Sequence, residues 1–151
     1  MTDQKYVLET LRRAGKSAAE QIQTAAQDMT GTQLYAEDGY IPEFKAASER
    51  KNMLERAVGF VCKSSAGRVV RLLQPYDSSV YPQEPEELPA QWGFVWSTDP
   101  EKALRFIALA TSPYATGDCC TEGGHVWRSK MDNNAWNPNE YPSGWEDLGE
   151  V

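Results

Sequence analysis

Basic charge, histidine, cysteine and long apolar runs are all scarce in this 151-residue sequence. Fifteen Lys and Arg residues stand against 22 Asp and Glu residues, so the formal net charge is −7. This balance argues against duplex nucleic acid, which requires a basic face, and against anionic lipid, which attracts clustered Lys and Arg. The longest apolar run spans only residues 106–110, whereas about 20 residues are needed to cross a bilayer. We therefore expect no nucleic-acid partner and no membrane span.

The scarcity of cysteine and histidine limits the disulfide bonds and metal sites that the chain can form. Three cysteines are too few for a disulfide scaffold, and one histidine, His125, excludes a metal site with several histidine ligands. The adjacent Cys119 and Cys120 would point to opposite faces of a strand, where they could not easily share a tetrahedral ion. The sequence also has no P-loop, no dinucleotide-binding glycine pattern and no Gly-x-Ser-x-Gly turn. We expect a protein made in the cytoplasm that is not an enzyme and binds no metal or cofactor.

The charge that is present lies unevenly along the chain. Residues 1–30 have a net charge of zero, residues 31–110 carry −2, and residues 111–151 carry −5. The last segment also holds three of the five tryptophans. This unevenness predicts three parts: a helical arm over residues 1–31, a β module over 32–110 and a second β module over 111–151. If the last module binds anything, the ligand should be neutral or cationic.

The arm is predicted from helical periodicity over residues 3–29. Apolar side chains recur every three or four positions, at Val7, Leu11, Ala14, Ala18, Ile22, Ala25 and Met29. Asp3 is a suitable N-cap, and Gly31 stands where a helix commonly stops. The stripe is narrow and rich in alanine, so it needs a partner. That partner is either the rest of the chain or a larger assembly, in which case the assembly residues would be Val7, Leu11, Ala18, Ile22 and Met29.

Strand patterns follow the arm in two similar groups. The first group predicts strands at residues 57–63, 68–73 and 91–96, with a Gly turn after the first strand and a proline-rich loop before the third. The second group predicts strands at 114–120 and 125–130, again joined by a Gly turn, and a polar loop leading to residues 145–148. A further helical piece is possible near residues 46–56. The expected fold class is α+β: an N-terminal helix followed by two small, three-stranded antiparallel β modules.

The two groups are similar in the order and spacing of several residues, which indicates an internal repeat. Corresponding positions are Gly59 and Gly117, Gly67 and Gly124, Arg71 and Arg128, and Trp92 and Trp145. The separations are 58, 57, 57 and 53 residues, and the last is smaller because the final loop is shorter.

The second group also carries a family resemblance, through Tyr-x-x-Gly, a Gly-rich turn, Val-Trp-Arg-Ser, Trp-x-Pro and Trp-x-x-Leu. The matching positions are Tyr114, Gly117, Gly124, Val126, Trp127, Trp136, Pro138, Trp145 and Leu148. This order resembles the chitin-binding-type carbohydrate-binding modules of family 5/12, and still more the versions found in tailed-bacteriophage tail and baseplate proteins. The resemblance implies a short twisted sheet and, in chitinases, non-catalytic binding of β-linked amino sugars. Those modules place an aromatic pair just after the second strand, where this sequence has Met131 and Asp132.

The aromatic residues of the last module therefore divide into two expected roles. The module core is predicted to comprise Tyr114, Gly117, Gly124, Trp127 and Trp145. The polar loop offers candidate glycan contacts at Trp136, Tyr141, Asn134 and Asn137, because sugar faces stack on aromatic rings while asparagine bonds hydroxyl groups. The alternative for this loop is that its own aromatic residues merely hold it in place.

Two functions from different classes follow from these patterns. The first is a structural or attachment protein of a phage tail, baseplate or tail-like particle, in which the helix assembles copies with one another or with other tail subunits. Such a protein would be made in the host cytoplasm and end in the virion. The second is a module that binds cell-wall or surface polysaccharide. An assembly chaperone absent from the mature particle is a third possibility.

Overall fold

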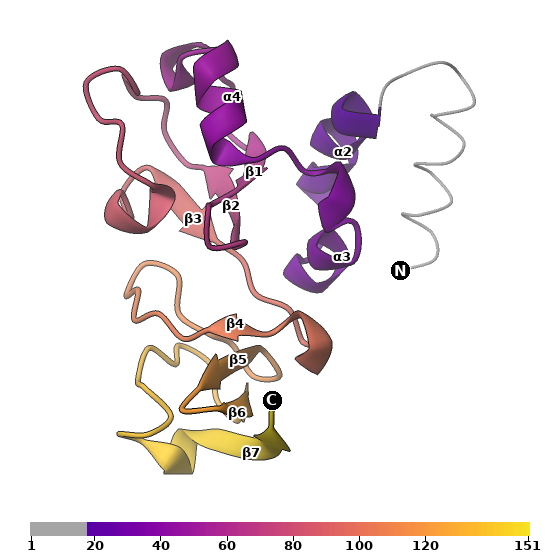
Figure 1. Ribbon diagram of the computed structural model, residues 1–151, viewed down its shortest axis with the longest axis vertical. Helices are drawn as coiled ribbons and strands as arrows, with labels where there is room; N and C mark the ends of the chain where they lie inside the picture. The colour runs from indigo at the N-terminus through magenta and orange to yellow at the C-terminus, as the bar shows by residue number, and fades with distance from the viewer. Residues whose placement is uncertain (1–17) are drawn as a thin grey trace. The chain divides into compact units, whose positions relative to one another are not determined.

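The computed structural model describes residues 18–151, which form an α+β fold of short helices and two small sheets (Figure 1). The chain divides into two compact units, residues 1–95 and 96–151, which we call unit 1 and unit 2. The predicted fold class is thus confirmed. The division falls 15 residues earlier than the predicted boundary at residue 110. No helix in the described part of the chain is both long and apolar enough to span a bilayer.

Unit 1 combines a helical layer with a three-stranded antiparallel sheet in the order β1-β2-β3. Its helices are α2 (Ala18–Ala25), η1 (Ala26–Asp28), α3 (Gly31–Ala36), η2 (Asp38–Tyr40), α4 (Phe44–Arg50), η3 (Met53–Glu55) and η4 (Pro85–Glu87). Its strands are β1 (Val61–Lys63), β2 (Val69–Leu72) and β3 (Trp92–Phe94). All three strands lie inside the segments predicted for them.

Within the described residues, the predicted helix over residues 3–29 is present as α2, which tightens into η1 and ends at Asp28. A new helix, α3, starts after Thr30. Thr30 and Gln33 form a capping box: the Thr30 side chain accepts from the Gln33 backbone N–H, and the Gln33 side chain accepts from that of Thr30. This cap starts α3 at Gly31, where the sequence pattern predicted only the end of the preceding helix.

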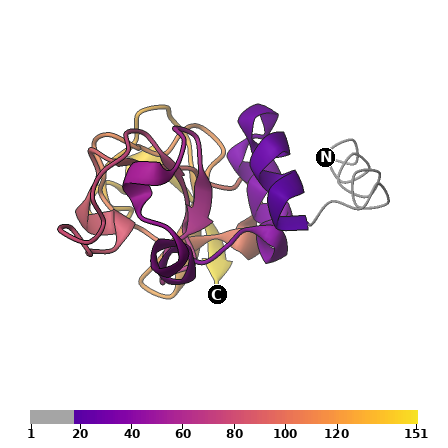
Figure 2. The same cartoon turned by 90° about the horizontal axis from the view of Figure 1, so that it is seen from above.

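The described part of the predicted arm packs within unit 1. Ile22, Ala26 and Met29 are buried. Arg71 on β2 donates to the carbonyls of Ala26 and Met29 at 2.7 and 2.6 Å, which satisfies orphan carbonyls at the end of this helical segment. Both views show α2 and α3 on the same side of the unit 1 sheet (Figure 1 and Figure 2). For residues 18–29, packing on the chain's own domain is therefore the correct interpretation.

A separate arm ending at residue 31 is accordingly not seen in the described residues. Ile22 and Met29, predicted to mediate assembly, are used in the interior of unit 1. Val7 and Leu11 lie outside the described residues. Ala18 starts α2.

The opposite side of the unit 1 sheet is closed by aromatic packing. The Trp92 ring meets Phe44 of α4 edge-on at 5.8 Å and Tyr76 at 6.2 Å, and its indole N–H donates to the Tyr76 hydroxyl at 3.0 Å.

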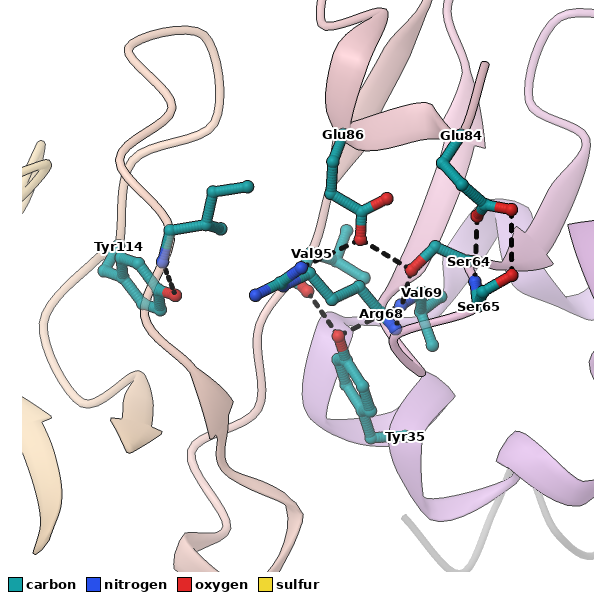
Figure 3. Close-up of polar contacts among 10 residues, drawn as sticks. Tyr35, Ser64, Ser65, Arg68, Val69, Glu84, Glu86, Val95 and Tyr114 are labelled. Carbon is teal, nitrogen blue, oxygen red and sulfur yellow. Dashed lines mark hydrogen bonds and ion pairs between the residues drawn. The ribbon is translucent and has the colours of Figure 1, made fainter. Parts of the chain in front are cut away.

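Tyr35 of α3 links β2 to the end of β3, since its hydroxyl accepts from the Val69 N–H and donates to the Val95 carbonyl (Figure 3). Burial raises the pKa of Tyr35, so this hydroxyl stays protonated as the bond to Val95 requires.

A polar network holds the proline-rich loop of unit 1 against the β1–β2 turn (Figure 3). Glu84 accepts from both the backbone N–H and the hydroxyl of Ser65, at 2.9 and 2.8 Å. Glu86 accepts from the Ser64 hydroxyl at 2.7 Å and pairs with Arg68 at 2.9 Å. Since the Arg68 and Glu86 side chains are both largely buried, the loop has a fixed course despite its four prolines.

Unit 2 is a four-stranded sheet in the order β4-β5-β6-β7. Its strands are β4 (Leu104–Arg105), β5 (Cys119–Glu122), β6 (His125–Ser129) and β7 (Trp145–Glu150), with η5 (Pro100–Lys102) and η6 (Pro142–Gly144) in the connections. The last three strands form the predicted antiparallel arrangement. The two-residue β4 pairs parallel to β5, so this module is mixed and four-stranded, not purely antiparallel and three-stranded as predicted.

The earlier unit boundary has a physical cause in the packing of unit 2. Trp96 stacks on Tyr114 with ring centroids 4.3 Å apart, and Phe106 stacks on the same ring at 5.5 Å. Trp145 meets Phe106 and Tyr114 edge-on at 6.0 and 5.4 Å. Two of these four core rings therefore come from the segment that the sequence pattern assigned to the first module.

The internal repeat extends to the pairing of individual residues. The partners Val61↔Arg71 and Cys62↔Val70 in unit 1 correspond to Cys119↔Arg128 and Cys120↔Trp127 in unit 2, and Leu72↔Trp92 corresponds to Ser129↔Trp145. Gly59 donates to the Leu72 carbonyl at 2.8 Å, just as Gly117 donates to that of Ser129 at 2.9 Å. The predicted equivalence of Trp92 with Trp145 thus holds in strand register despite the unequal loops.

Candidate functional site

Two large aromatic rings are exposed next to each other on the β6–β7 connection of unit 2. Trp136 is 53% exposed and Tyr141 is 41% exposed. Their ring centroids are 5.8 Å apart and their planes are inclined by 57°. We call this pair the two-ring surface. Exposed aromatic residues that lie together in this way present apolar area without being part of the core.

Hydrogen bonds from the core fix the backbone under Trp136. The Trp145 indole N–H donates to the Trp136 carbonyl at 2.9 Å, and the Trp136 N–H donates to the Asn134 side-chain oxygen at 3.3 Å. The ring is thus carried on an anchored backbone, not on an unrestrained loop.

The Tyr141 ring is positioned by the short helix that follows it. Gly144, in η6, lies directly beneath the ring: a Cβ atom there would come within 2.9 Å of Tyr141 Cδ2 and Cε2. The Tyr141 N–H also donates to the Asn137 carbonyl at 2.8 Å. Gly144 therefore leaves the space that lets the Tyr141 ring lie flat against the chain.

Asn134, a predicted glycan contact, is fully buried at 0% exposure. Its side-chain N–H groups donate to the Ser129 hydroxyl and the Gly144 carbonyl at 3.0 and 3.1 Å. Its backbone exchanges two hydrogen bonds with Tyr114, each 2.8 Å long. The structure therefore places Asn134 beneath the two-ring surface, where it positions the loop and has no exposed atoms to offer a ligand.

Asn137 also braces the loop, though it is only half-buried. Its side-chain N–H donates to Glu122 at 3.1 Å and its side-chain oxygen accepts from the Asn139 N–H at 2.8 Å. Of the four residues predicted to contact glycan, the structure thus brings two exposed rings together and assigns the two asparagines to their support. Sequence reasoning could not separate these roles, because all four residues lie in one polar loop.

Two of the five residues predicted for the module core are buried, whereas Gly117 and Trp127 are half-buried and Gly124 is exposed. Tyr114 and Trp145 are buried, and Gly117 and Gly124 both adopt left-handed backbone angles, with φ of 96° and 81°. Trp127 differs, since it is only half-buried although it lies on β6, between β5 and β7. Its indole N–H donates to the Glu122 carbonyl at 3.0 Å and its ring lies 6.1 Å from that of His125. The buried Trp96 and the half-buried Phe106 stack on Tyr114, and neither was among the residues predicted for this core.

The histidine, aspartate and cysteine side chains on the unit 2 strands are either hydrogen-bonded to one another or buried. His125 bonds Asp147 at 2.9 Å across β6 and β7, and this bond lowers the pKa of Asp147. Burial raises the pKa of the Cys119 and Cys120 thiols, which keeps both protonated. Within residues 18–151, no three His, Cys, Asp or Glu side chains are gathered as a metal site would require.

Comparison of the chain with family models, with curated proteins and with solved structures gave no significant match.

Proposed function

We propose that this chain is a non-catalytic structural and attachment protein of a phage tail, baseplate or tail-like particle. The observation that carries the proposal is the repeated sheet of units 1 and 2 with one exposed aromatic pair. Two copies of one meander, each with a buried core, form a stable scaffold, and the second copy presents the two-ring surface outward. The resemblance of unit 2 to modules of phage tail proteins supports the same role.

Assembly in this proposal rests on residues 1–17. Ile22 and Met29 are occupied inside unit 1, so Val7 and Leu11 are the remaining large apolar residues of the stripe. Residues 1–17 carry four basic and two acidic side chains, in contrast to the acidic remainder of the chain. A segment that is apolar on one stripe and opposite in charge to the rest is suited to joining subunits.

Light scattering coupled to size-exclusion chromatography tests this assembly role in the full chain. We expect the wild type to run as an oligomer and the double variant Val7→Asp, Leu11→Asp to run as a monomer with unchanged far-ultraviolet circular dichroism. Thr10→Asp adds a charge to the same segment outside the stripe and is the matched control, expected to leave the mass unchanged. A wild-type chain that is strictly monomeric at every concentration would refute the role.

The two-ring surface favours a second candidate function, binding of cell-wall or surface polysaccharide. Sugar rings present flat C–H faces that pack on aromatic side chains, and the Trp136 and Tyr141 rings are held in place by the core. Trp136→Ala should abolish retention on insoluble chitin or peptidoglycan while the thermal unfolding midpoint stays unchanged. Tyr81→Ala is the matched control, because Tyr81 of unit 1 is also 53% exposed and is outside the two-ring surface. Failure of the wild-type chain to bind any polysaccharide tested would eliminate this second function and leave the assembly role standing.

A further inference from the structure

A cavity of about 320 Å³ lies within unit 1, lined by residues of α2, α4 and the segment leading into β1. Its walls combine apolar residues (Pro42, Ala47 and Phe60) with two arginines, Arg50 and Arg56, and with Glu20 and Gln23 of α2. An adjoining hollow of about 340 Å³ shares Gln23, Arg56 and Phe60 with it, so the two form one continuous groove. This volume is at the lower end of the range for small-molecule sites. The groove belongs to unit 1 and shares no residue with the two-ring surface.

Arg56 has unused hydrogen-bonding capacity at the centre of this groove. Its guanidinium carbon lies 4.3 Å from the centroid of the Phe60 ring, and Nη2 donates to the Ala47 carbonyl at 2.9 Å. Its Nε is buried and has no hydrogen-bond partner among the described residues. A guanidinium has five N–H donors, and a buried donor without a partner costs about 1–3 kcal/mol. Stacking on Phe60 therefore fixes the guanidinium plane, and among the described residues its N–H groups have one hydrogen-bond acceptor, the Ala47 carbonyl.

A second cation lines the cavity with Arg56, and the two arginines outnumber its one carboxylate, Glu20. Arg50 comes from the last turn of α4, and neither arginine forms an ion pair within the described part of the chain. Burial is the main cause that lowers the pKa of Arg56, and the charge of Arg50 lowers it further. Two cations and one carboxylate next to an apolar wall leave a net positive charge, which is the electrostatic complement of an anion that carries an apolar group.

We propose that this groove binds an organic carboxylate, whose apolar or aromatic body packs against Phe60 and Ala47 while its carboxylate bonds Arg56 beside Arg50. The planar guanidinium matches a carboxylate in bidentate geometry, and Phe60 holds it in the orientation that this geometry requires. The same chemistry is offered by a free small acid and by an acidic side chain next to apolar residues on a second copy of the chain.

Titration calorimetry of the full chain with benzoate tests the proposal, with benzamide as the uncharged analogue of the same shape. We expect benzoate to bind and benzamide not to bind. Arg50→Gln should weaken benzoate binding about tenfold, the loss of one charge-assisted contact worth about 1.4 kcal/mol. Arg56→Lys, which keeps the charge but removes the fork, should weaken it at least as much. Lys45→Gln, an exposed change on α4 outside the groove, should leave binding unchanged.

Equal binding of benzoate and benzamide would overturn the proposal, as would wild-type affinity in Arg50→Gln. Because the Arg50 side chain makes no hydrogen bond with residues 18–151, Arg50→Gln tests the proposal even if Arg56→Lys does not fold. Light scattering with and without benzoate then separates the two sources of the carboxylate. A fall in mass on adding benzoate identifies an acidic side chain of a second copy, and an unchanged mass identifies a free acid.

Discussion

At the scale of single residues, two glycines at equivalent positions set the start of each meander. Gly59 and Gly117 have φ of 94° and 96°, in the left-handed region where a side chain is strained. Each is the third residue of a turn and donates its N–H to the carbonyl of the last residue of the second strand. The match in φ explains why glycine recurs at this spacing in the sequence: the chain must enter the sheet through a conformation that other residues rarely adopt.

Replacing Gly117 by alanine should destabilise unit 2 by about 1–2 kcal/mol, through backbone conformation and not through crowding. A Cβ atom at Gly117 would meet only Thr98 Cγ2, at an ordinary 3.4 Å. Gly39→Ala is the matched control, because a Cβ atom there meets nothing within 4 Å and its backbone angle is permissive. Urea unfolding of both variants makes the comparison. A Gly117→Ala midpoint equal to that of Gly39→Ala would contradict this explanation.

Asp118 and Asp132, which support the same turn, should affect stability in opposite directions as pH changes. Asp118 accepts from the Ala115 N–H at 2.8 Å, but burial dominates and raises its pKa. The folded state therefore holds this proton more tightly than the unfolded chain, so the stabilisation is complete at low pH and is lost as pH rises through the raised pKa. Asp132 accepts from the Thr116 N–H at 3.0 Å, which lowers its pKa, so its stabilisation is lost as pH falls.

Unfolding free energies measured from pH 3 to pH 8 test these signs. The wild-type protein should lose stability as pH rises through the raised pKa of Asp118, and Asp118→Asn should not show this loss. Asp132→Asn should lower the free energy of unfolding at neutral pH, so this free energy should fall less as the pH is lowered. Identical pH profiles for the two variants would show that the local hydrogen bonds and burial do not control these carboxyl groups.

At the scale of elements, side chains of α2, in place of another strand, form hydrogen bonds with the backbone at the open edge of β1. The Gln23 side chain both donates to the Val61 carbonyl at 2.7 Å and accepts from the Val61 N–H at 2.9 Å. Gln27 adds a bond to the Gly59 carbonyl at 3.1 Å. In unit 2 the corresponding Cys119 N–H donates to the Ser97 carbonyl, so each unit protects the same edge by a different means.

Gln23→Ala should therefore cost about 2–3 kcal/mol, because it leaves two backbone groups of β1 without partners. Thr24→Ala, the next residue on α2, removes only an exposed hydroxyl bonded within its own helix and should cost less than about 0.5 kcal/mol. Urea unfolding followed by circular dichroism measures both. If the two variants unfold at the same midpoint, the edge of β1 does not depend on α2.

The parts of the fold that the sequence predicted are those set by local patterns. The five predicted strands of residues 57–130 and the third strand of unit 2 were marked by glycine turns and β-branched or aromatic runs, and each has a counterpart in the structure. The strand predicted at residues 114–120 is shifted, since β5 spans Cys119–Glu122. Helix α3, which starts after Thr30, and the two-residue β4 were missed, because a side-chain cap and a short parallel bridge leave little periodic signal. Likewise, the burial of Asn134 depends on contacts with Ser129 and Gly144 that only the folded chain brings together.

At the scale of the whole molecule, the acidic charge and the aromatic surface lie in the same unit. Residues 96–151 hold nine acidic and four basic side chains, so unit 2 has a net charge of −5 and its ligand is expected to be neutral or cationic. Assembly through residues 1–17 would present several copies of the two-ring surface together. Weak individual contacts would then combine, since linked sites commonly gain 10²-fold or more in overall affinity.

The most direct test of this account is retention of the full chain on insoluble cell-wall polysaccharide, compared across four proteins. We predict that the wild type and Tyr81→Ala are retained equally, that Trp136→Ala is not retained, and that the Val7→Asp, Leu11→Asp variant is retained at least tenfold more weakly than the wild type. Equal retention of Trp136→Ala and Tyr81→Ala would contradict the account, because attachment would then not depend on the two-ring surface.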